Sequence, residues 1–284
     1  MNNLTINQTL SNLENINLNS PLFFILGPCV IENEAHSLKA AEFLKKLSEK
    51  LKFNFIFKSS FDKANRTSLG NYRGTGFHEG LKVLEKVRSI FDIPVITDIH
   101  EISQVNEVAS VVDVLQIPAF LCRQTDLLLA AGKTGKFINV KKGQFLAPEN
   151  MKSVLEKVTS TGNKKVWACE RGYSFGYNNL IVDYRNFEIM KRFGHPVVFD
   201  ATHSVQMPSA NGCSSGGDRR FAAPLAISAV AQGISGLFME VHDNPEHALC
   251  DGPNSIRFSQ LEELLKYLIE LDSWVKSKKT PEIS

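Results

Sequence analysis

The sequence lacks the features that would direct a protein to a membrane, to nucleic acid or to secretion. No apolar run reaches the roughly 18 to 20 residues that span a bilayer. The 32 Lys and Arg residues are balanced by 30 Asp and Glu, and a formal charge of +2 does not favour nucleic acid or an anionic membrane as the partner. Residues 1–20 hold seven Asn and no cation, unlike a secretory signal. We therefore expect a cytoplasmic globular protein.

Cysteine is scarce and shows no paired spacing. The five cysteines are an odd number, which does not fit the framework of a disulfide-rich secreted domain. Reduced thiols are therefore expected throughout. The cysteines are Cys29, Cys122, Cys169, Cys213 and Cys250.

The chain also lacks a Pro-, Gly- or Ser-rich linker and a glycine-rich dinucleotide loop. The first β-rich run is followed by Gly27-Pro-Cys-Val-Ile-Glu32, which argues against a doubly wound sheet. Such runs start about 20 to 40 residues apart and alternate with segments of helical spacing. This pattern predicts a single (β/α)8 TIM barrel over residues 21–284, after a short, partly disordered extension at 1–20. The β-rich runs are 23–26, 54–57, 94–97, 114–117, 137–140, 166–169, 197–199 and 236–239. The helical segments are 37–51, 80–91, 102–111, 126–132, 148–158 and 222–233.

Cations gather where the predicted strands end. The active site of such a barrel lies at the carboxyl ends of its strands, and Lys58, Lys63, Lys141 and Arg171 follow the second, fifth and sixth runs. So many cations at one rim indicate a bound anion, and the mixture of lysine and arginine suits phosphate and carboxylate groups. The alternative is a set of independent surface ion pairs.

A second set of groups follows the seventh, eighth and first runs, which are neighbours in a closed barrel. His203, Glu240 and Cys29 lie there, and Asp251 follows the eighth run. Taken singly, such residues more often pack in the core or form ion pairs. Together, thiolate, imidazole and carboxylates suit Zn²⁺, Fe²⁺, Mn²⁺ or Co²⁺.

Seven short stretches at the predicted strand ends occur in a characteristic order: Gly27-Pro-Cys29, Lys63-Ala-Asn-Arg-Thr-Ser68, Gln116-Ile-Pro-Ala119, Arg123-Gln-Thr-Asp126, Asn139-Val-Lys-Lys142, Phe199-Asp-Ala-Thr-His203 and Asp251-Gly-Pro253. Together they resemble one enzyme family, 3-deoxy-D-manno-octulosonate 8-phosphate synthase. The resemblance covers about residues 22–273 and depends on the order and number of the motifs. It implies a homotetrameric (β/α)8 barrel that condenses phosphoenolpyruvate with D-arabinose 5-phosphate and water, releases phosphate and serves lipopolysaccharide synthesis.

The resemblance implies a role for each matching residue. Arg123 would reach the sugar phosphate of a neighbouring subunit, and Cys29 is typical of the metal-using members, whereas Cys250 before Asp251 is more typical of the metal-free form. Residues with catalytic roles would be Lys63, Lys141, Arg171 and His203. Substrates would be bound by Lys58, Ser60, Asn65, Arg66, Ser68, Gln116, Ala119, Arg123 and Gln144. The metal ligands would be Cys29, His203, Glu240 and Asp251.

Two alternatives stay open at this point. One is a related synthase that condenses phosphoenolpyruvate with erythrose 4-phosphate to give 3-deoxy-D-arabino-heptulosonate 7-phosphate. The other is a non-catalytic barrel that binds sugar phosphates. In either case we expect the loops 204–221 and 243–257, rich in Gly, Ser, Asn and Asp, to close over the site.

Overall fold

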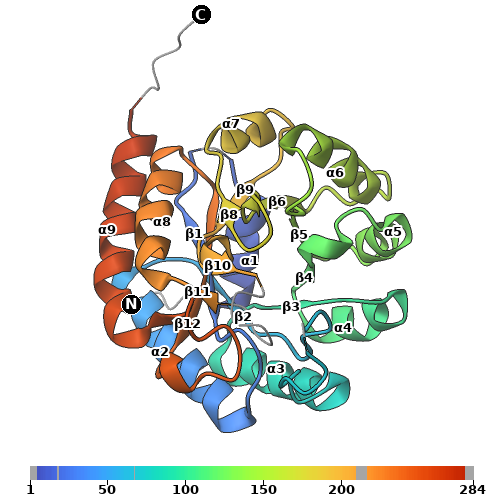
Figure 1. The fold of residues 1–284 in the computed structure, drawn as a ribbon, viewed down its shortest axis with the longest axis vertical. Helices are drawn as coiled ribbons and strands as arrows, with labels where there is room; N and C mark the ends of the chain where they lie inside the picture. The colour runs from blue at the N-terminus through green and yellow to red at the C-terminus, as the bar shows by residue number, and fades with distance from the viewer. Residues whose placement is uncertain (1–4, 18, 67, 209–215, 279–284) are drawn as a thin grey trace, which may run out of the picture.

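The computed structural model describes residues 5–17, 19–66, 68–208 and 216–278. Eight parallel strands form a closed barrel, because β1 pairs with β2 on one side and with β12 on the other. The register of the closing pair runs from Phe23 opposite Gly236 to Gly27 opposite Glu240. The prediction of a (β/α)8 barrel is confirmed (Figure 1). The barrel strands are β1 (Phe23–Gly27), β2 (Phe55–Lys58), β3 (Val95–Asp98), β4 (Val114–Ile117), β5 (Phe137–Lys141), β6 (Val166–Glu170), β9 (Val197–Asp200) and β12 (Gly236–His242).

Helices alternate with these strands and surround them (Figure 1). Each helix presents an apolar stripe to the sheet, as α2 does with Ala40, Ala41, Leu44 and Leu47. The Asn33 side chain caps the first turn of α2 by accepting a hydrogen bond from the backbone N–H of His36. The helices of the ring are α2 (Glu34–Leu51), α3 (Phe77–Phe91), α4 (Val105–Val111), α5 (Thr125–Lys133), α6 (Met151–Thr159), α7 (Arg185–Lys191), α8 (Ala222–Ala231) and α9 (Phe258–Lys276).

The inside of the barrel is a separate apolar core. Its side chains come from the inward positions of the strands and include Phe23, Trp167 and Phe238. Leu13 of α1 (Ile6–Glu14) belongs to this core, so α1 closes the amino-terminal end of the barrel. In Figure 1 this helix lies behind the centre of the ring. Residues 6–14 of the expected extension are therefore an ordered helix, because the barrel offers its apolar face a surface to cover.

Short β pairs extend some strand ends above the barrel. β7 (Tyr173–Ser174) pairs with β8 (Leu180–Ile181), and β10 (Gln206–Met207) pairs with β11 (Gly216–Gly217). β13 (Ile256–Arg257) continues beside β12. Within the described part of the chain, no helix has the length and apolar character needed to cross a membrane.

Candidate active site

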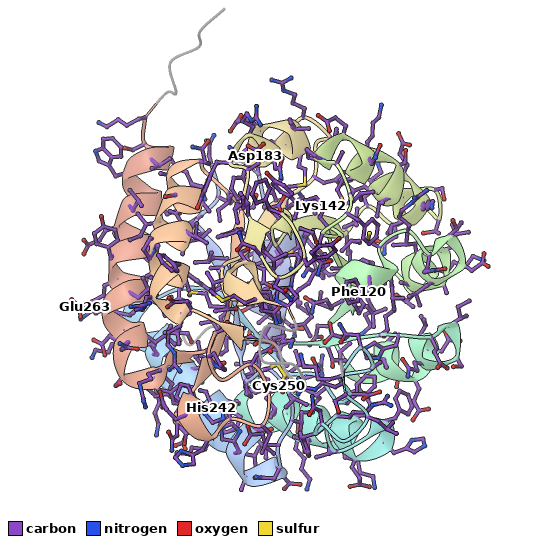
Figure 2. All side chains as sticks on the ribbon, in the orientation of Figure 1. Phe120, Lys142, Asp183, His242, Cys250 and Glu263 are labelled. Carbon is purple, nitrogen blue, oxygen red and sulfur yellow. A yellow bond between two sulfur atoms is a disulfide. The ribbon has the colours of Figure 1, made fainter. Side chains whose placement is uncertain are left out.

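A cavity of about 490 Å³ lies at the carboxyl ends of the barrel strands. Phe120 and Cys250, two of the residues that line it, lie inside the ring of helices in Figure 2. A larger groove of about 860 Å³ lies outside the barrel between α8 and α9, and the described residues that line it include none of those predicted from the sequence. The predicted residues that line the cavity are Lys58, Lys63, Asn65, Arg66, Gln116, Ala119, Lys141, Gln144, Arg171, His203 and Asp251.

The other predicted residues do not line the cavity, and they lie at different distances from it. Cys29 and Glu240 lie directly beside it, since the Cys29 Sγ is 3.5 Å from Asp251 and Glu240 is 3.4 Å from Lys58. Ser60 lies beneath the cavity, where its hydroxyl donates to a buried carboxylate. Ser68 and Arg123 are not among the described residues that line the cavity, and Arg123 is exposed to solvent.

Three cations at the cavity, Lys58, Lys141 and Arg171, are buried, and their surroundings shift their pKa values in different directions. Lys58 is 1% exposed, and burial together with the nearby Lys63 ammonium lowers its pKa to about 8. Burial acts in the same direction on Lys141, but the Asp200 carboxylate 2.5 Å away raises the pKa of this lysine above its ordinary value. Burial lowers the pKa of Arg171. Nη1 of Arg171 is buried and has no hydrogen-bond partner among the described residues. These cations are arranged to receive an anion.

Two buried aspartates hold this set in place, and neither was among the predicted site residues. Asp98, at the end of β3, accepts from Ser60 and from Gln116, the latter at 2.6 Å. Burial would raise the pKa of Asp98, but Lys58 and Lys63 hold it well below its usual range. Asp200 likewise keeps a low pKa, because His203 and Lys141 outweigh its burial. Their place in the sequence could have identified them, since both aspartates are the last residues of barrel strands.

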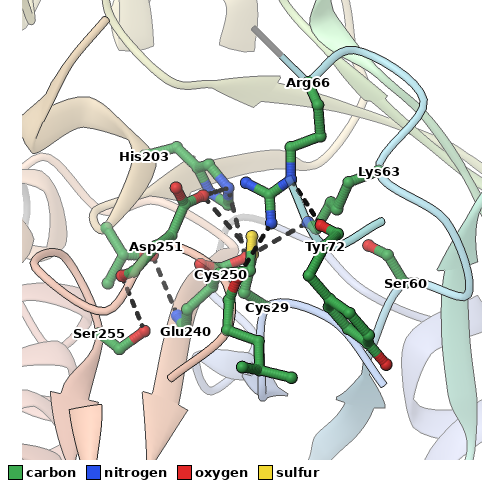
Figure 3. Close-up of a disulfide and its surroundings, with 12 residues drawn as sticks. Cys29, Ser60, Lys63, Arg66, Tyr72, His203, Glu240, Cys250, Asp251 and Ser255 are labelled. Carbon is green, nitrogen blue, oxygen red and sulfur yellow. Dashed lines mark hydrogen bonds and ion pairs between the residues drawn. A yellow bond between two sulfur atoms is a disulfide. The ribbon is translucent and has the colours of Figure 1, made fainter. Parts of the chain in front are cut away.

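The four predicted metal ligands converge from opposite ends of the sequence (Figure 3). Nε2 of His203 lies 3.3 Å from Glu240 and 3.6 Å from Asp251. Bonds of about 2.0–2.3 Å to a tetrahedral metal place the ligand atoms about 3.3–3.7 Å apart, which these separations match. Oε2 of Glu240 is buried and lacks a hydrogen-bond partner among the described residues. His203, Glu240 and Asp251 therefore fit a divalent transition metal, whereas Cys29 forms a separate group with Cys250 and Asp251.

Asp200 determines which nitrogen of His203 faces this group. Nδ1 of His203 lies 2.7 Å from the Asp200 carboxylate, which when ionised accepts a hydrogen bond but cannot donate one. Nδ1 therefore donates to Asp200, and this contact turns Nε2 toward Glu240 and Asp251. A carboxylate behind a ligating histidine is the usual support of a metal site.

Cys29 and Cys250 form a disulfide beside Asp251 (Figure 3). The expectation of reduced thiols is therefore wrong for this pair, although Cys122 and Cys169 are free and buried. Cys213 lies outside the described residues. The two paired cysteines are 221 positions apart in the chain, and they meet because β1 closes the barrel against β12. A disulfide sulfur is not a thiolate, so Cys29 can bind metal only after reduction.

The expected lids are partly described. Asp251 and Cys250, in the loop after β12, line the cavity. In the loop 204–221, Gln206 lines the cavity, whereas 209–215 lie outside the described residues. Whether these loops move stays a prediction.

The fold and this site define a class, an enzyme barrel with a cation-lined mouth beside a cluster of metal-type ligands. The chain belongs to the DAHP synthetase I family, whose model matches residues 9–277. It is 54% identical over 263 residues to a 2-dehydro-3-deoxyphosphooctonate aldolase of Desulfatibacillum aliphaticivorans, covering 93% of this chain and 96% of the relative. Proteins of the same name in Trichlorobacter lovleyi and Geobacter sulfurreducens are 58% and 55% identical over 255 and 256 residues, each covering 90% of this chain and 94% of the relative.

Proposed function

We propose that the protein condenses phosphoenolpyruvate with D-arabinose 5-phosphate and water to give 3-deoxy-D-manno-octulosonate 8-phosphate and phosphate, a step of lipopolysaccharide synthesis. The relatives at 54–58% identity bear the name of an enzyme of this octulosonate, which favours it over the heptulosonate alternative. The observation that carries the proposal is the cavity itself, in which Lys58, Lys63, Lys141 and Arg171 face the group formed by His203 and Asp251.

The cations would hold phosphoenolpyruvate and offset its repulsion from the second phosphorylated substrate. The enol carbon attacks the aldehyde, water adds to the adjacent carbon, and the resulting hemiketal expels phosphate. Holding both reactants in line lowers such a barrier by up to roughly 7 to 11 kcal/mol. The free Nη1 of Arg171 is placed to donate to a phosphate oxygen. Asn65 and Arg66, on the loop after β2, would bind the arabinose phosphate.

A divalent metal, Zn²⁺, Fe²⁺, Mn²⁺ or Co²⁺, would be held by reduced Cys29, His203, Glu240 and Asp251. When bound, it supplies Lewis-acid polarisation of an oxygen atom. The protein's own contribution is to fix the ligands, because Asp200 orients the His203 ring and Thr202 Oγ1 accepts from the backbone N–H of Glu240 at 3.0 Å.

We also propose that the enzyme is a homotetramer in which Arg123 completes the site of a neighbouring subunit. Arg123 is exposed and lies outside the cavity of its own chain. Large apolar side chains are exposed on the loops after β4, β5 and β6, with Phe120 at 54%, Phe145 at 60% and Phe175 at 60%. Exposed apolar side chains on consecutive loops at one end of the barrel favour a protein interface there.

The assignment is tested by comparing two aldehydes in a phosphate-release assay with phosphoenolpyruvate. Arabinose 5-phosphate should be consumed much faster than erythrose 4-phosphate, because the Asn65-Arg66 stretch is similar to that of the octulosonate enzymes. Lys141→Ala serves as the inactive control, since it removes a buried cation from the cavity. A preference for the four-carbon aldehyde would establish the heptulosonate alternative, and no release with either would favour a non-catalytic barrel.

A further inference from the structure

Gln206 bridges the two halves of the cavity. It begins β10, three positions after His203, and lines the cavity. Its Nε2 donates to Oδ2 of Asp251 at 2.9 Å, and its Oε1 accepts from Nη2 of Arg171 at 2.7 Å. The amide orientation is fixed by its partners, because an ionised carboxylate only accepts and a guanidinium only donates. One side chain therefore joins a cation of the anion pocket to a predicted metal ligand.

The contact to Asp251 is made at the atom that matters for ligation. Oδ2 of Asp251 is also the oxygen that faces Cys29 Sγ at 3.5 Å and His203 Nε2 at 3.6 Å. The backbone of Asp251 adopts φ 47°, a left-handed conformation that a non-glycine residue rarely holds without support. Side-chain contacts hold the direction of this carboxylate, and the hydrogen bond from the Gln206 amide is one of them.

The contact to Arg171 leaves that guanidinium ready for a ligand. Nη2 donates to Gln206, whereas Nη1 is buried and unpaired among the described residues. An anion bound at Nη1 would fix the plane of the guanidinium, and with it the position of the Gln206 amide.

We propose that Gln206 is a positioning residue that couples anion binding at Arg171 to the orientation of Asp251 for metal binding. The proposal rests on the proposed function, because it uses the same anion pocket and the same ligand set. Coupling between two binding equilibria is reciprocal, so phosphate should strengthen metal binding by the factor by which metal strengthens phosphate binding. A factor of at least about 5 lies within the usual range of such couplings.

The test is a Co²⁺ titration of the reduced, metal-depleted full-length protein with and without inorganic phosphate, followed by the thiolate absorption of bound Co²⁺. In the wild-type protein phosphate should lower the Co²⁺ dissociation constant about 5-fold or more. Gln206→Met keeps the length of the side chain but removes both hydrogen bonds, so Co²⁺ should bind more weakly and phosphate should leave its affinity unchanged. Gln206→Glu keeps an acceptor for Arg171 but loses the donor to Asp251, and it should also abolish the effect of phosphate. Gln260→Met, on the exposed face of α9, is the matched control and should retain the full effect.

A phosphate effect of equal size in wild type and in Gln206→Met would overturn the proposal, as would the absence of any effect in wild type. Failure of the proposed function has a different signature. In that case the two-aldehyde assay shows no octulosonate synthesis, whatever the titration gives. If the wild-type protein makes the octulosonate but binds no Co²⁺, the metal site and the coupling are both disproved, and the proposed reaction still stands.

Discussion

At the scale of single residues, the two buried lysines of the anion pocket differ in their readiness to lose a proton. Lys141 is held charged by Asp200, which contacts it at 2.5 Å. Lys58 has weaker partners, Glu240 at 3.4 Å and Asp98 at 4.0 Å, so desolvation prevails and its pKa falls to about 8. Burial thus brings the pKa of Lys58 down to the upper end of the pH range in which enzymes are assayed.

This difference predicts a pH dependence for the use of phosphoenolpyruvate. The protonated form of Lys58 attracts the substrate, so kcat/KM for phosphoenolpyruvate should decrease as pH rises through about 8. Lys58→Arg should move this decrease to higher pH, because a guanidinium keeps its proton. The measurement is a pH series of initial rates at low phosphoenolpyruvate concentration. A profile that stays flat well above pH 8 in the wild type would show that Lys58 does not titrate in this range.

A second prediction concerns Cys29, because its sulfur cannot form the disulfide and bind a metal at the same time. The oxidised wild-type protein should bind little Co²⁺ or Zn²⁺, and reduction should restore binding. Cys250→Ser should bind metal without reductant, since it leaves Cys29 without its partner, whereas Cys29→Ser should bind poorly in both conditions. Elemental analysis after gel filtration measures the metal content. Equal metal content in oxidised and reduced wild type would exclude Cys29 as a ligand.

At the scale of elements, α1 covers the amino-terminal end of the barrel. Leu13 is 3% exposed and packs with the inner core, while Leu10 and Ile16 contact the same core from partly buried positions. This helix lies at the end of the barrel opposite the cavity. It should therefore contribute to stability and not to chemistry.

Leu13→Ala should lower the free energy of unfolding by about 2–3 kcal/mol, because it removes a buried side chain from a packed core. Denaturant unfolding measures this change, and the kinetic constants of the folded variant should stay the same. Asn7→Ala, at an exposed position of the same helix, is the control and should have little effect. An unchanged midpoint for Leu13→Ala would mean that α1 is not packed against the barrel in solution.

The elements also differ in how far they could be predicted from sequence. The barrel strands are short runs of β-branched and aromatic residues, buried on both faces, and each was recognisable by itself. Helix α1 was not, because its polar sequence gains a stable partner only once the barrel exists. Gln206 and the Cys29–Cys250 pair were missed because Gln206 and Cys250 lie on the loops after β9 and β12, and their contacts depend on the path of those loops. The ligand group at His203 was predictable because it follows from strand order alone.

At the scale of the whole molecule, the proposed sharing of Arg123 makes activity a property of the assembly. Arg123→Ala should raise the KM for arabinose 5-phosphate most, while its own cavity stays intact. The Lys141→Ala subunit lacks a cation of its own cavity, but it still supplies Arg123 to its neighbour. Mixing Arg123→Ala with Lys141→Ala under subunit exchange should restore part of the activity at low arabinose 5-phosphate concentration, measured as phosphate release. If activity does not recover although subunit exchange is demonstrated, Arg123 acts in the active site of its own subunit.

The closure of the barrel by β1 and β12 has a consequence for synthesis on the ribosome. A nascent chain that has not yet released residues 236–242 has β1 exposed as an open edge. It also lacks Glu240, Cys250 and Asp251, so the cluster around His203 cannot form. Residues 236–242 must therefore leave the ribosome before the barrel closes, and products truncated before them should be recognisable to proteases by their unpaired edge strands.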